Sequence, residues 1–210
     1  MTPRIVVTGT DTGIGKTVFA AGLTALLGAC YWKPVQAGLA EETDSCRVQR
    51  LAELADDRVL PEAYRLPEPA SPDRAARLAG ISIDPLSLHP PQSVGRPVVI
   101  EGAGGVMVPL DSQTLYLDVF ARWQLPVVLC ARTSLGTINH SLLSLAALRS
   151  RRIDVLGIAF IGDGHADNEE TICRLGGVKR LGRLPWITPL TARSLQNVFA
   201  TQFQRRDFEP

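Results

Sequence analysis

Short apolar runs alternate along the chain with longer segments in which apolar residues recur at helical spacing. The apolar runs lie at residues 5–7, 29–32, 98–100, 126–131, 155–161 and 180–184. Several are apolar throughout, which is typical of strands buried on both faces of a sheet. Helical patterns cover residues 18–27, 45–54, 71–80, 114–123, 167–175 and 191–205, and another helix ends near residue 150. This alternation predicts an α/β fold with a doubly wound, mainly parallel sheet and helices on both faces.

The first strand leads into a glycine-rich turn that ends in Gly15-Lys16-Thr17 and opens an apolar helix. That order is typical of a P-loop, where backbone N–H groups face phosphates, the lysine reaches the outer phosphates and the hydroxyl binds Mg²⁺. Thr10 stands where the first glycine of the motif is usual, and Gly9 precedes it. A glycine-rich turn with an incidental lysine is the alternative, but the strand–turn–helix context favours a P-loop NTPase-like fold. The candidate nucleotide-binding residues here are Gly13, Ile14, Gly15, Lys16, Thr17 and Val18.

Three oxygen-bearing side chains are candidates to hold Mg²⁺. Thr17 is the P-loop hydroxyl, Glu101 ends an apolar strand, and Asp44 precedes a helix. Mg²⁺ favours one or two carboxylates together with phosphate oxygens and water, so this set is sufficient. The alternatives are that Asp44 only caps its helix and that Glu101 is an exposed acid at a strand end.

Two lysines and a second glycine-rich turn are expected near the nucleotide. Lys16 and Lys33 are candidate catalytic groups because phosphoryl transfer needs positioning and neutralisation of charge. Lys33 follows a short strand at the edge of the sheet where ligands bind, although it could be a bystander on the surface. Backbone N–H groups of the second turn can approach an anion closely. Its candidate residues are Gly102, Ala103 and Gly104.

The middle of the chain is rich in proline and predicts little regular structure. Residues 33–38 are interpreted as a strand end and turn, and residues 81–97 as a loop. Ser71, Pro72 and Asp73 predict a short helix with a serine cap that ends before Gly80.

Composition narrows the class of protein. The 210 residues are expected to form one domain, 1–210, and 45% hydrophobic residues are ordinary for a soluble protein. A net charge of +1 gives no reason to expect nucleic acid or a membrane as partner. The four cysteines lack C-x-x-C spacing, which disfavours zinc, and Cys130 is expected to be buried. Without an apparent signal peptide or membrane span, a cytoplasmic location is expected.

Six motifs stand in an order that resembles dethiobiotin synthetases. They are Thr8-Gly-Thr-Asp-Thr-x-x-Gly-Lys-Thr17, Lys33-Pro-Val-Gln36, Glu68-Pro-x-Ser-Pro72, Glu101-Gly-Ala-Gly-Gly105, Leu135-Gly-x-Ile-Asn-His140 and Leu181-Gly-x-x-Pro-Trp186. The resemblance covers most of the chain. It implies an ATP-dependent cyclo-ligase of biotin biosynthesis that converts 7,8-diaminopelargonic acid and CO₂ (or bicarbonate) into dethiobiotin, through a carbamate and a carbamoyl-phosphate intermediate.

The resemblance also implies roles for individual residues. Lys16, Lys33 and Thr12 would act on carbamate and γ-phosphate, while Thr17, Asp44 and Glu101 hold Mg²⁺. The nucleotide base would lie along Pro185, Trp186 and Ile187. Substrate would contact Ala37, Ser71 and Pro72. The implied assembly is a homodimer in which the neighbouring subunit binds the substrate carboxylate through Leu135, Gly136, Thr137, Ile138 and Asn139, although Asn139 could instead be a simple helix cap.

The chain departs from the family pattern at three informative positions. Gly13 stands where many members carry an acid. Ala37 replaces a Ser or Thr, so one hydrogen bond to substrate is missing, worth about 1 kcal/mol. Ile161 replaces an Asn that reads adenine, which leaves the choice between ATP and other nucleoside triphosphates open.

Two other classes of P-loop protein fit the sequence less well. An amidotransferase of the cobyric acid type needs a glutaminase domain that 210 residues cannot include. A partitioning ATPase of the ParA/MinD type would have an extra lysine where Asp11 stands, and a basic amphipathic tail. The terminal helix is expected to pack on the sheet, because its apolar side is followed by the acidic end 207–210.

Overall fold

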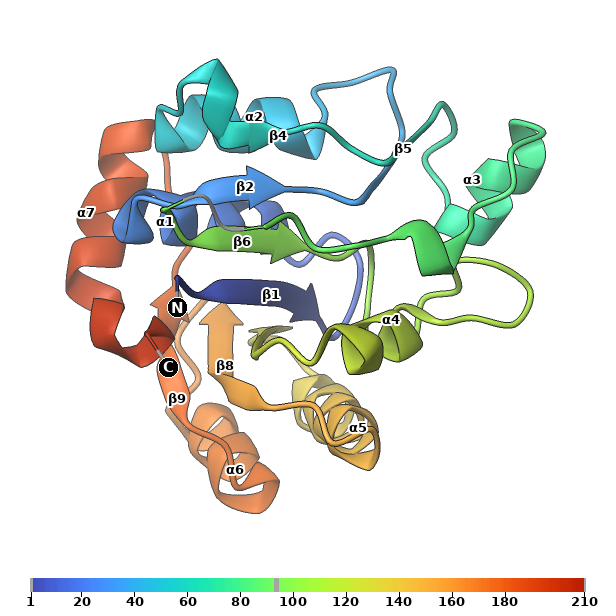
Figure 1. Cartoon of the computed structure of the whole chain (residues 1–210). Helices are drawn as coiled ribbons and strands as arrows, with labels where there is room; N and C mark the ends of the chain where they lie inside the picture. The colour runs from blue at the N-terminus through green and yellow to red at the C-terminus, as the bar shows by residue number, and fades with distance from the viewer. Residues whose placement is uncertain (1, 93–94, 210) are drawn as a thin grey trace.

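The structure, a computed structural model, describes residues 2–92 and 95–209. Its main sheet has the strand order β4-β2-β6-β1-β7-β8-β9, and each neighbouring pair is parallel. The strands are β1 (Arg4–Gly9), β2 (Cys30–Trp32), β4 (Val59–Leu60), β6 (Val98–Glu101), β7 (Val127–Arg132), β8 (Val155–Ile161) and β9 (Arg180–Leu184). Figure 1 shows β2, β6 and β1 running in one direction, with α3 (Pro72–Leu78) beyond their C-terminal ends. The predicted parallel sheet is confirmed.

Helices cover both faces of this sheet, which divides the core in two. One core contains residues of α1 (Lys16–Leu27), α2 (Asp44–Ala52) and α7 (Ala192–Gln202). The other contains residues of α3, α4 (Tyr116–Trp123), α5 (Thr137–Ser150) and α6 (Ala166–Gly176). Alternate residues of β1 point to opposite faces, so Ile5 and Val7 join the first core and Val6 joins the second. The doubly wound arrangement is therefore built from strands that are apolar on both sides.

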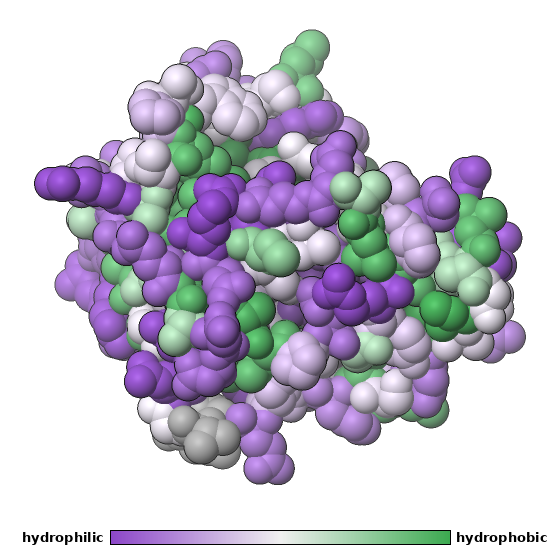
Figure 2. Space-filling view, turned by 90° about the horizontal axis from the view of Figure 1, so that it is seen from above, coloured by the Kyte–Doolittle hydropathy of each residue, from purple (hydrophilic) through white to green (hydrophobic). Residues whose placement is uncertain are grey.

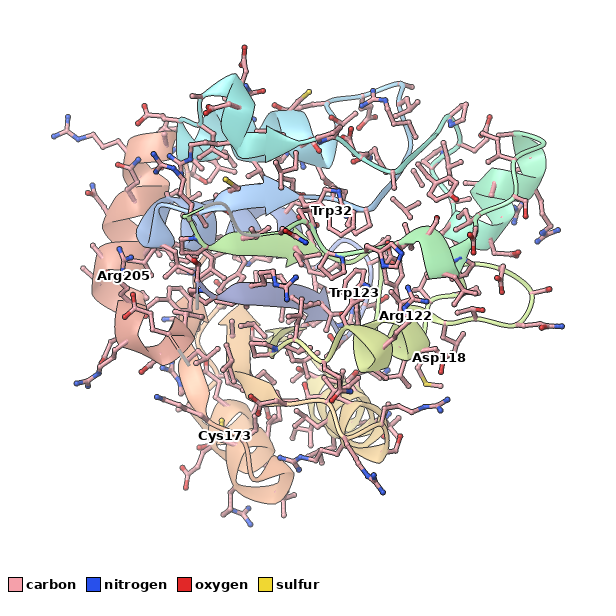
Figure 3. All side chains as sticks on the ribbon, in the orientation of Figure 1. Trp32, Asp118, Arg122, Trp123, Cys173 and Arg205 are labelled. Carbon is pink, nitrogen blue, oxygen red and sulfur yellow. The ribbon has the colours of Figure 1, made fainter. Side chains whose placement is uncertain are left out.

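Aromatic side chains fill the two cores. Trp32 and Trp123 lie side by side, with ring centroids 5.9 Å apart (Figure 3). On the other face, Phe19 of α1 contacts Phe199 and Phe203 at 5.5 and 5.4 Å. The expectation that the terminal helix packs within the fold is confirmed, although that helix ends at Gln202 and a 3₁₀ turn, η3 (Arg205–Phe208), follows.

The proline-rich middle of the chain differs most from expectation. Residues 33–38 were predicted as a strand end and turn, but they contain a separate strand. This strand, β3 (Val35–Ala37), pairs in parallel with β5 (Tyr64–Leu66) in a small second sheet. Two 3₁₀ turns, η1 (Asp56–Arg58) and η2 (Pro85–Ser87), also form, the second within the segment predicted as loop. That segment is attached to α4 by a hydrogen bond, which Trp123 Nε1 donates to the Leu88 carbonyl at 2.8 Å. Positions 93–94 of the predicted loop lie outside the described residues.

The surface mixes polar and apolar residues. On the face in Figure 2, hydrophobic residues are interspersed among hydrophilic ones. No helix within the described part of the chain is long and apolar enough to cross a bilayer.

Candidate active site

The loop between β1 and α1 folds back over the end of its own strand. A Cβ added to Gly9 would stand 2.8 Å from Ile14 Cδ1 and 2.9 Å from Lys16 Cδ. A larger side chain at position 9 would require the Ile14 and Lys16 side chains to shift, so glycine lets both pack closely over the end of the strand. Lys16 Nζ donates to the Asp11 carbonyl at 2.5 Å across the turn. Burial lowers the pKa of Lys16, an effect that nearby Glu101 partly offsets.

The three predicted metal-binding side chains meet beside the start of α1. The Thr17 hydroxyl lies 2.8 Å from Asp44 Oδ1 and 2.9 Å from Glu101 Oε1. Asp44 does not cap its helix, because Thr43 accepts the hydrogen bond from the Cys46 amide. Glu101 is only 1% exposed, so it is not a solvated acid at a strand end. Two carboxylates and a hydroxyl that converge in this way suit Mg²⁺, which prefers oxygen ligands.

Lys33 lies between these carboxylates. Its ammonium is 2.8 Å from Asp44 Oδ2 and 3.2 Å from Glu101 Oε1, and it donates to the Gly102 carbonyl at 3.0 Å. The side chain is 4% exposed, so the interpretation as a bystander on the surface is wrong. Burial alone lowers the pKa of Lys33, but the two carboxylates outweigh it and the net shift is upward. Lys33 is therefore held as an ammonium.

A cavity of about 570 Å³ opens above these groups. Most of the predicted residues line it: Thr12, Gly13, Gly15, Lys16, Thr17, Val18, Lys33, Ala37, Asp44, Ser71, Pro72, Glu101, Ala103 and Gly104. Five further lining residues were not predicted: Val35, Arg47, Pro69, Ala70 and Val108. Pro69 and Ala70 belong to the motif at residues 68–72, so that motif could have indicated them. The Ser71 side chain makes no capping hydrogen bond, contrary to its predicted role.

The second glycine-rich turn lies against the P-loop. Gly104 has φ +65°, and a Cβ added there would stand 2.6 Å from Val108 Cγ2 and 3.2 Å from Thr12 Oγ1. Only glycine permits both this backbone conformation and this close approach. Thr12, Ala103 and Gly104 thus line the same cavity.

One buried residue that holds the site together was overlooked. Gln36 Oε1 accepts from the Asp44 amide at 3.1 Å, while Gln36 Nε2 donates to the carbonyls of Ala37 and Gly38. These bonds fix the start of α2 and with it the Asp44 carboxylate. The motif Lys33-Pro-Val-Gln36 contained the residue, but its pattern did not reveal this role.

Residues 135–139 do not line this cavity. Leu135 is 97% exposed, and Asn139 is an exposed third residue of α5 rather than its cap, which is Gly136. Thr137 is buried, and its hydroxyl donates to the Arg132 carbonyl. Ile138 packs against the core. The exposed end of this segment is therefore free to contact something outside its own chain.

Two other predicted nucleotide-binding residues, Ile14 and Gly102, also lie off the cavity lining. The Ile14 side chain is buried in the core on the α1 face. Gly102 contributes its carbonyl to Lys33 and donates its amide to Val7. Ile14 thus anchors the P-loop to the core, and Gly102 anchors the second glycine-rich turn to β1 and Lys33.

The predicted base-binding segment also lies outside the cavity. Trp186 is 67% exposed, and its indole lies beside Gly162 at the end of β8. Ile161 is buried, with its side chain directed at Gly15 beneath the P-loop. Gly162 itself accepts from Arg183 Nη1 at 3.0 Å. Ile161 thus supports the P-loop, while the polar side chains beside Gly162, next to Trp186, are Thr133 and Arg183.

The comparisons with known proteins agree with these motifs. A family model described as an AAA domain matches residues 3–194. The chain is 80% identical to the ATP-dependent dethiobiotin synthetase BioD of Bradyrhizobium sp. (strain BTAi1) over 210 residues, which cover 100% of both chains. It is 61% identical over 208 residues to the enzyme of the same name from Bradyrhizobium diazoefficiens, covering 99% of each chain.

Similarity to solved structures shows the fold. The septum site-determining protein MinD from Pyrococcus horikoshii OT3, complexed with Mg-ADP, matches with a TM-score of 0.55 and 15% identity, covering 100% of this chain and 90% of that chain. This distant likeness supports the P-loop architecture but not a switch function. The full-length identity to the Bradyrhizobium enzymes decides between the candidate families: the chain belongs to the family of ATP-dependent dethiobiotin synthetases.

Proposed function

We propose that this chain converts 7,8-diaminopelargonic acid, CO₂ and ATP into dethiobiotin, ADP and phosphate, as a step of biotin biosynthesis. The observation that carries the proposal is the convergence of two lysines and three oxygen-bearing side chains in one cavity of a dethiobiotin synthetase family member. Forming a cyclic urea from a diamine needs CO₂ activated by phosphorylation, and these groups suit phosphoryl transfer.

The residues divide this work. One substrate amine adds to CO₂ and loses a proton to give a carbamate. A carbamate oxygen attacks the γ-phosphate, and ADP leaves. The second amine then attacks the carbamoyl carbon, closes the ring and expels phosphate. Lys33 and Lys16 stabilise the negative charge shared by carbamate and γ-phosphate, and Thr12 with Ala103 and Gly104 of the second turn donates hydrogen bonds to the same oxygens.

Thr17, Asp44 and Glu101 would hold Mg²⁺. An ion held there would supply positive charge that offsets the negative charge developing on the phosphates. The Lys33 ammonium forms ion pairs with both Asp44 and Glu101, so the protein itself orients the two carboxylates. The 13–18 segment would hold the phosphates, and Pro185, Trp186 and Ile187 would lie along the base.

The active assembly in this proposal is a homodimer. Leu135 and Asn139 are exposed beside the N-terminus of α5, where a helix favours anions. Neither residue lines the cavity of its own chain. We therefore assign residues 135–139 to the carboxylate of substrate bound in the neighbouring subunit, while Ala37, Ser71 and Pro72 contact the same substrate from within the cavity.

Mixing two defective variants tests this shared site. Lys33→Ala removes the proposed catalytic ammonium from a subunit's own cavity. Asn139→Asp places a negative charge where the carboxylate of substrate in the neighbouring subunit would bind. After subunit exchange, half the dimers are hybrids and each hybrid keeps one intact site, so turnover should recover to roughly a quarter of the wild-type value.

Turnover of the mixture and its mass by analytical ultracentrifugation are the measurements. Asn197→Asp, at an exposed position of α7, is the matched control and should leave turnover unchanged. A mixture no more active than its components would contradict the shared site.

Nucleotide selectivity should be weak. The aliphatic Ile161 side chain cannot hydrogen-bond a base, and it points under the P-loop. We expect ATP, CTP and GTP to support turnover within about tenfold of each other, because the loss of one specific hydrogen bond leaves little discrimination. Competition between the nucleotides at fixed diamine measures this, and a preference for ATP above a hundredfold would contradict it.

Incorporation of isotopic CO₂ tests the proposed function itself. Labelled bicarbonate, diamine and each nucleotide in turn should yield labelled dethiobiotin and one phosphate per ring closed. Nucleotide hydrolysis that proceeds without diamine, and without incorporation of label when it is present, would overturn the assignment.

A further inference from the structure

The carboxylate of Glu101 has a partner that its motif does not reveal. The hydroxyl of Tyr31 donates to Glu101 Oε2 at 2.7 Å. Both residues are fully enclosed: Tyr31 is 0% exposed and Glu101 1%. The two positions are 70 residues apart in the chain, so only the fold brings them together.

Strand register explains the contact. β2 and β6 are parallel neighbours in which Tyr31 pairs with Val99. Because side chains alternate along a strand, Tyr31, Val99 and Glu101 share the face that α1 covers. A tyrosine is long enough to reach forward along this face from Val99 to Glu101.

The two oxygens of Glu101 therefore have separate partners. Oε1 accepts from Thr17 at 2.9 Å and from Lys33 at 3.2 Å, whereas Oε2 accepts from Tyr31. Fixing both oxygens prevents the carboxylate from rotating about its terminal bond. Without Tyr31, Oε2 would lack its hydrogen bond in a buried place, which is costly for a charged group.

We infer that Tyr31 is a positioning residue that orients Glu101 so that Oε1 faces the proposed Mg²⁺ site, an inference that rests on the proposed function. Residues behind a metal ligand that fix its orientation commonly change metal affinity or activity 10- to 100-fold when they are altered. Tyr31 does not itself line the cavity, so it acts through Glu101.

Tyr116 provides a matched control. It is also completely buried and lies in the other core, but its hydroxyl has no hydrogen-bond partner within the described residues. Burial raises the pKa of both tyrosines, so each hydroxyl stays protonated. Both hydroxyls interact electrostatically with Glu101, but only that of Tyr31 forms a hydrogen bond with its carboxylate, so the pair isolates the effect of that bond.

The experiment compares Tyr31→Phe with Tyr116→Phe. Binding of Mn²⁺, a substitute for Mg²⁺, is followed by electron paramagnetic resonance, and turnover is measured against Mg²⁺ concentration. Tyr31→Phe should weaken Mn²⁺ binding about tenfold and lower kcat by a similar factor, with the KM for diamine within about threefold of wild type. Tyr116→Phe should stay within about twofold in both measurements. Equal behaviour of the two variants would overturn the inference.

A double variant separates positioning from general stability. In a Glu101→Gln background there is no carboxylate to orient, so adding Tyr31→Phe should change Mn²⁺ binding by less than about twofold. A further tenfold loss there would contradict action through Glu101. Glu101→Asp provides a second route if Tyr31→Phe does not fold: its shorter carboxylate cannot span Tyr31 and Thr17, and Mn²⁺ binding should weaken although the charge remains. Wild-type affinity in that variant would count against the inference.

The same measurements separate a failure of the proposed metal site from a failure of the role inferred for Tyr31. If Glu101→Gln binds Mn²⁺ as wild type does, the proposed metal role fails and the Tyr31 inference falls with it. If Glu101→Gln weakens binding but Tyr31→Phe matches Tyr116→Phe, only the Tyr31 inference fails.

Discussion

Replacing Lys33 with alanine should lower kcat about a thousandfold, equivalent to about 4 kcal/mol of transition-state stabilisation, while nucleotide affinity changes less than about fivefold. The reason is position: Lys33 lines the cavity between the two carboxylates proposed to bind Mg²⁺, whereas Lys16 belongs to the P-loop that would hold the phosphates. An ammonium here is worth most when charge develops on carbamate and phosphate during transfer. Isotopic CO₂ incorporation gives kcat, and calorimetry with a non-hydrolysable ATP analogue gives affinity.

Lys33→Ala also leaves Asp44 and Glu101 without their buried counter-ion. Breaking such a pair costs about 3–5 kcal/mol, so the metal-free variant should unfold at lower urea concentration and regain stability when Mg²⁺ is added. Lys179→Ala is the matched control, because that lysine pairs with Asp207 at the surface and lies outside the cavity. Turnover of Lys33→Ala within tenfold of wild type would refute a catalytic role.

Glu101→Gln should raise the Mg²⁺ concentration needed for half-maximal turnover at least tenfold and lower kcat about a hundredfold. The substitution keeps the shape of the side chain but removes one of the two negative charges proposed for the metal site. It also weakens the hydrogen bonds from Thr17 and Lys33, which are now made to a neutral group. Turnover measured across a Mg²⁺ titration reports both effects.

A second buried glutamate controls for the change of charge. Glu169 is buried on α6 and pairs with Arg180 at 2.8 Å, outside the cavity. Glu169→Gln should reduce stability by a modest amount and leave the Mg²⁺ dependence unchanged. An unchanged Mg²⁺ dependence in Glu101→Gln would remove Glu101 from the metal site.

The fold class and most of the residues that line the cavity could be predicted from the sequence alone. Apolar runs predicted the strands because a parallel strand covered on both faces has no polar side. Lys16, Thr17 and Glu101 could be identified because each stands at a fixed place relative to a strand or a helix start. These positions depend only on neighbouring residues in the sequence, so they can be predicted before the fold is known.

Features that depend on contacts between distant parts of the chain could not be predicted in this way. The tertiary structure made residues 35–37 a strand, because a partner strand at residues 64–66 lies beside them. It also turned Ile161 under the P-loop and set Tyr31 against Glu101 across a 70-residue separation. A pattern of apolar and polar residues says which face a side chain occupies, but not which neighbour it meets there. That depends on strand order and register, which are fixed only when the whole sheet is assembled.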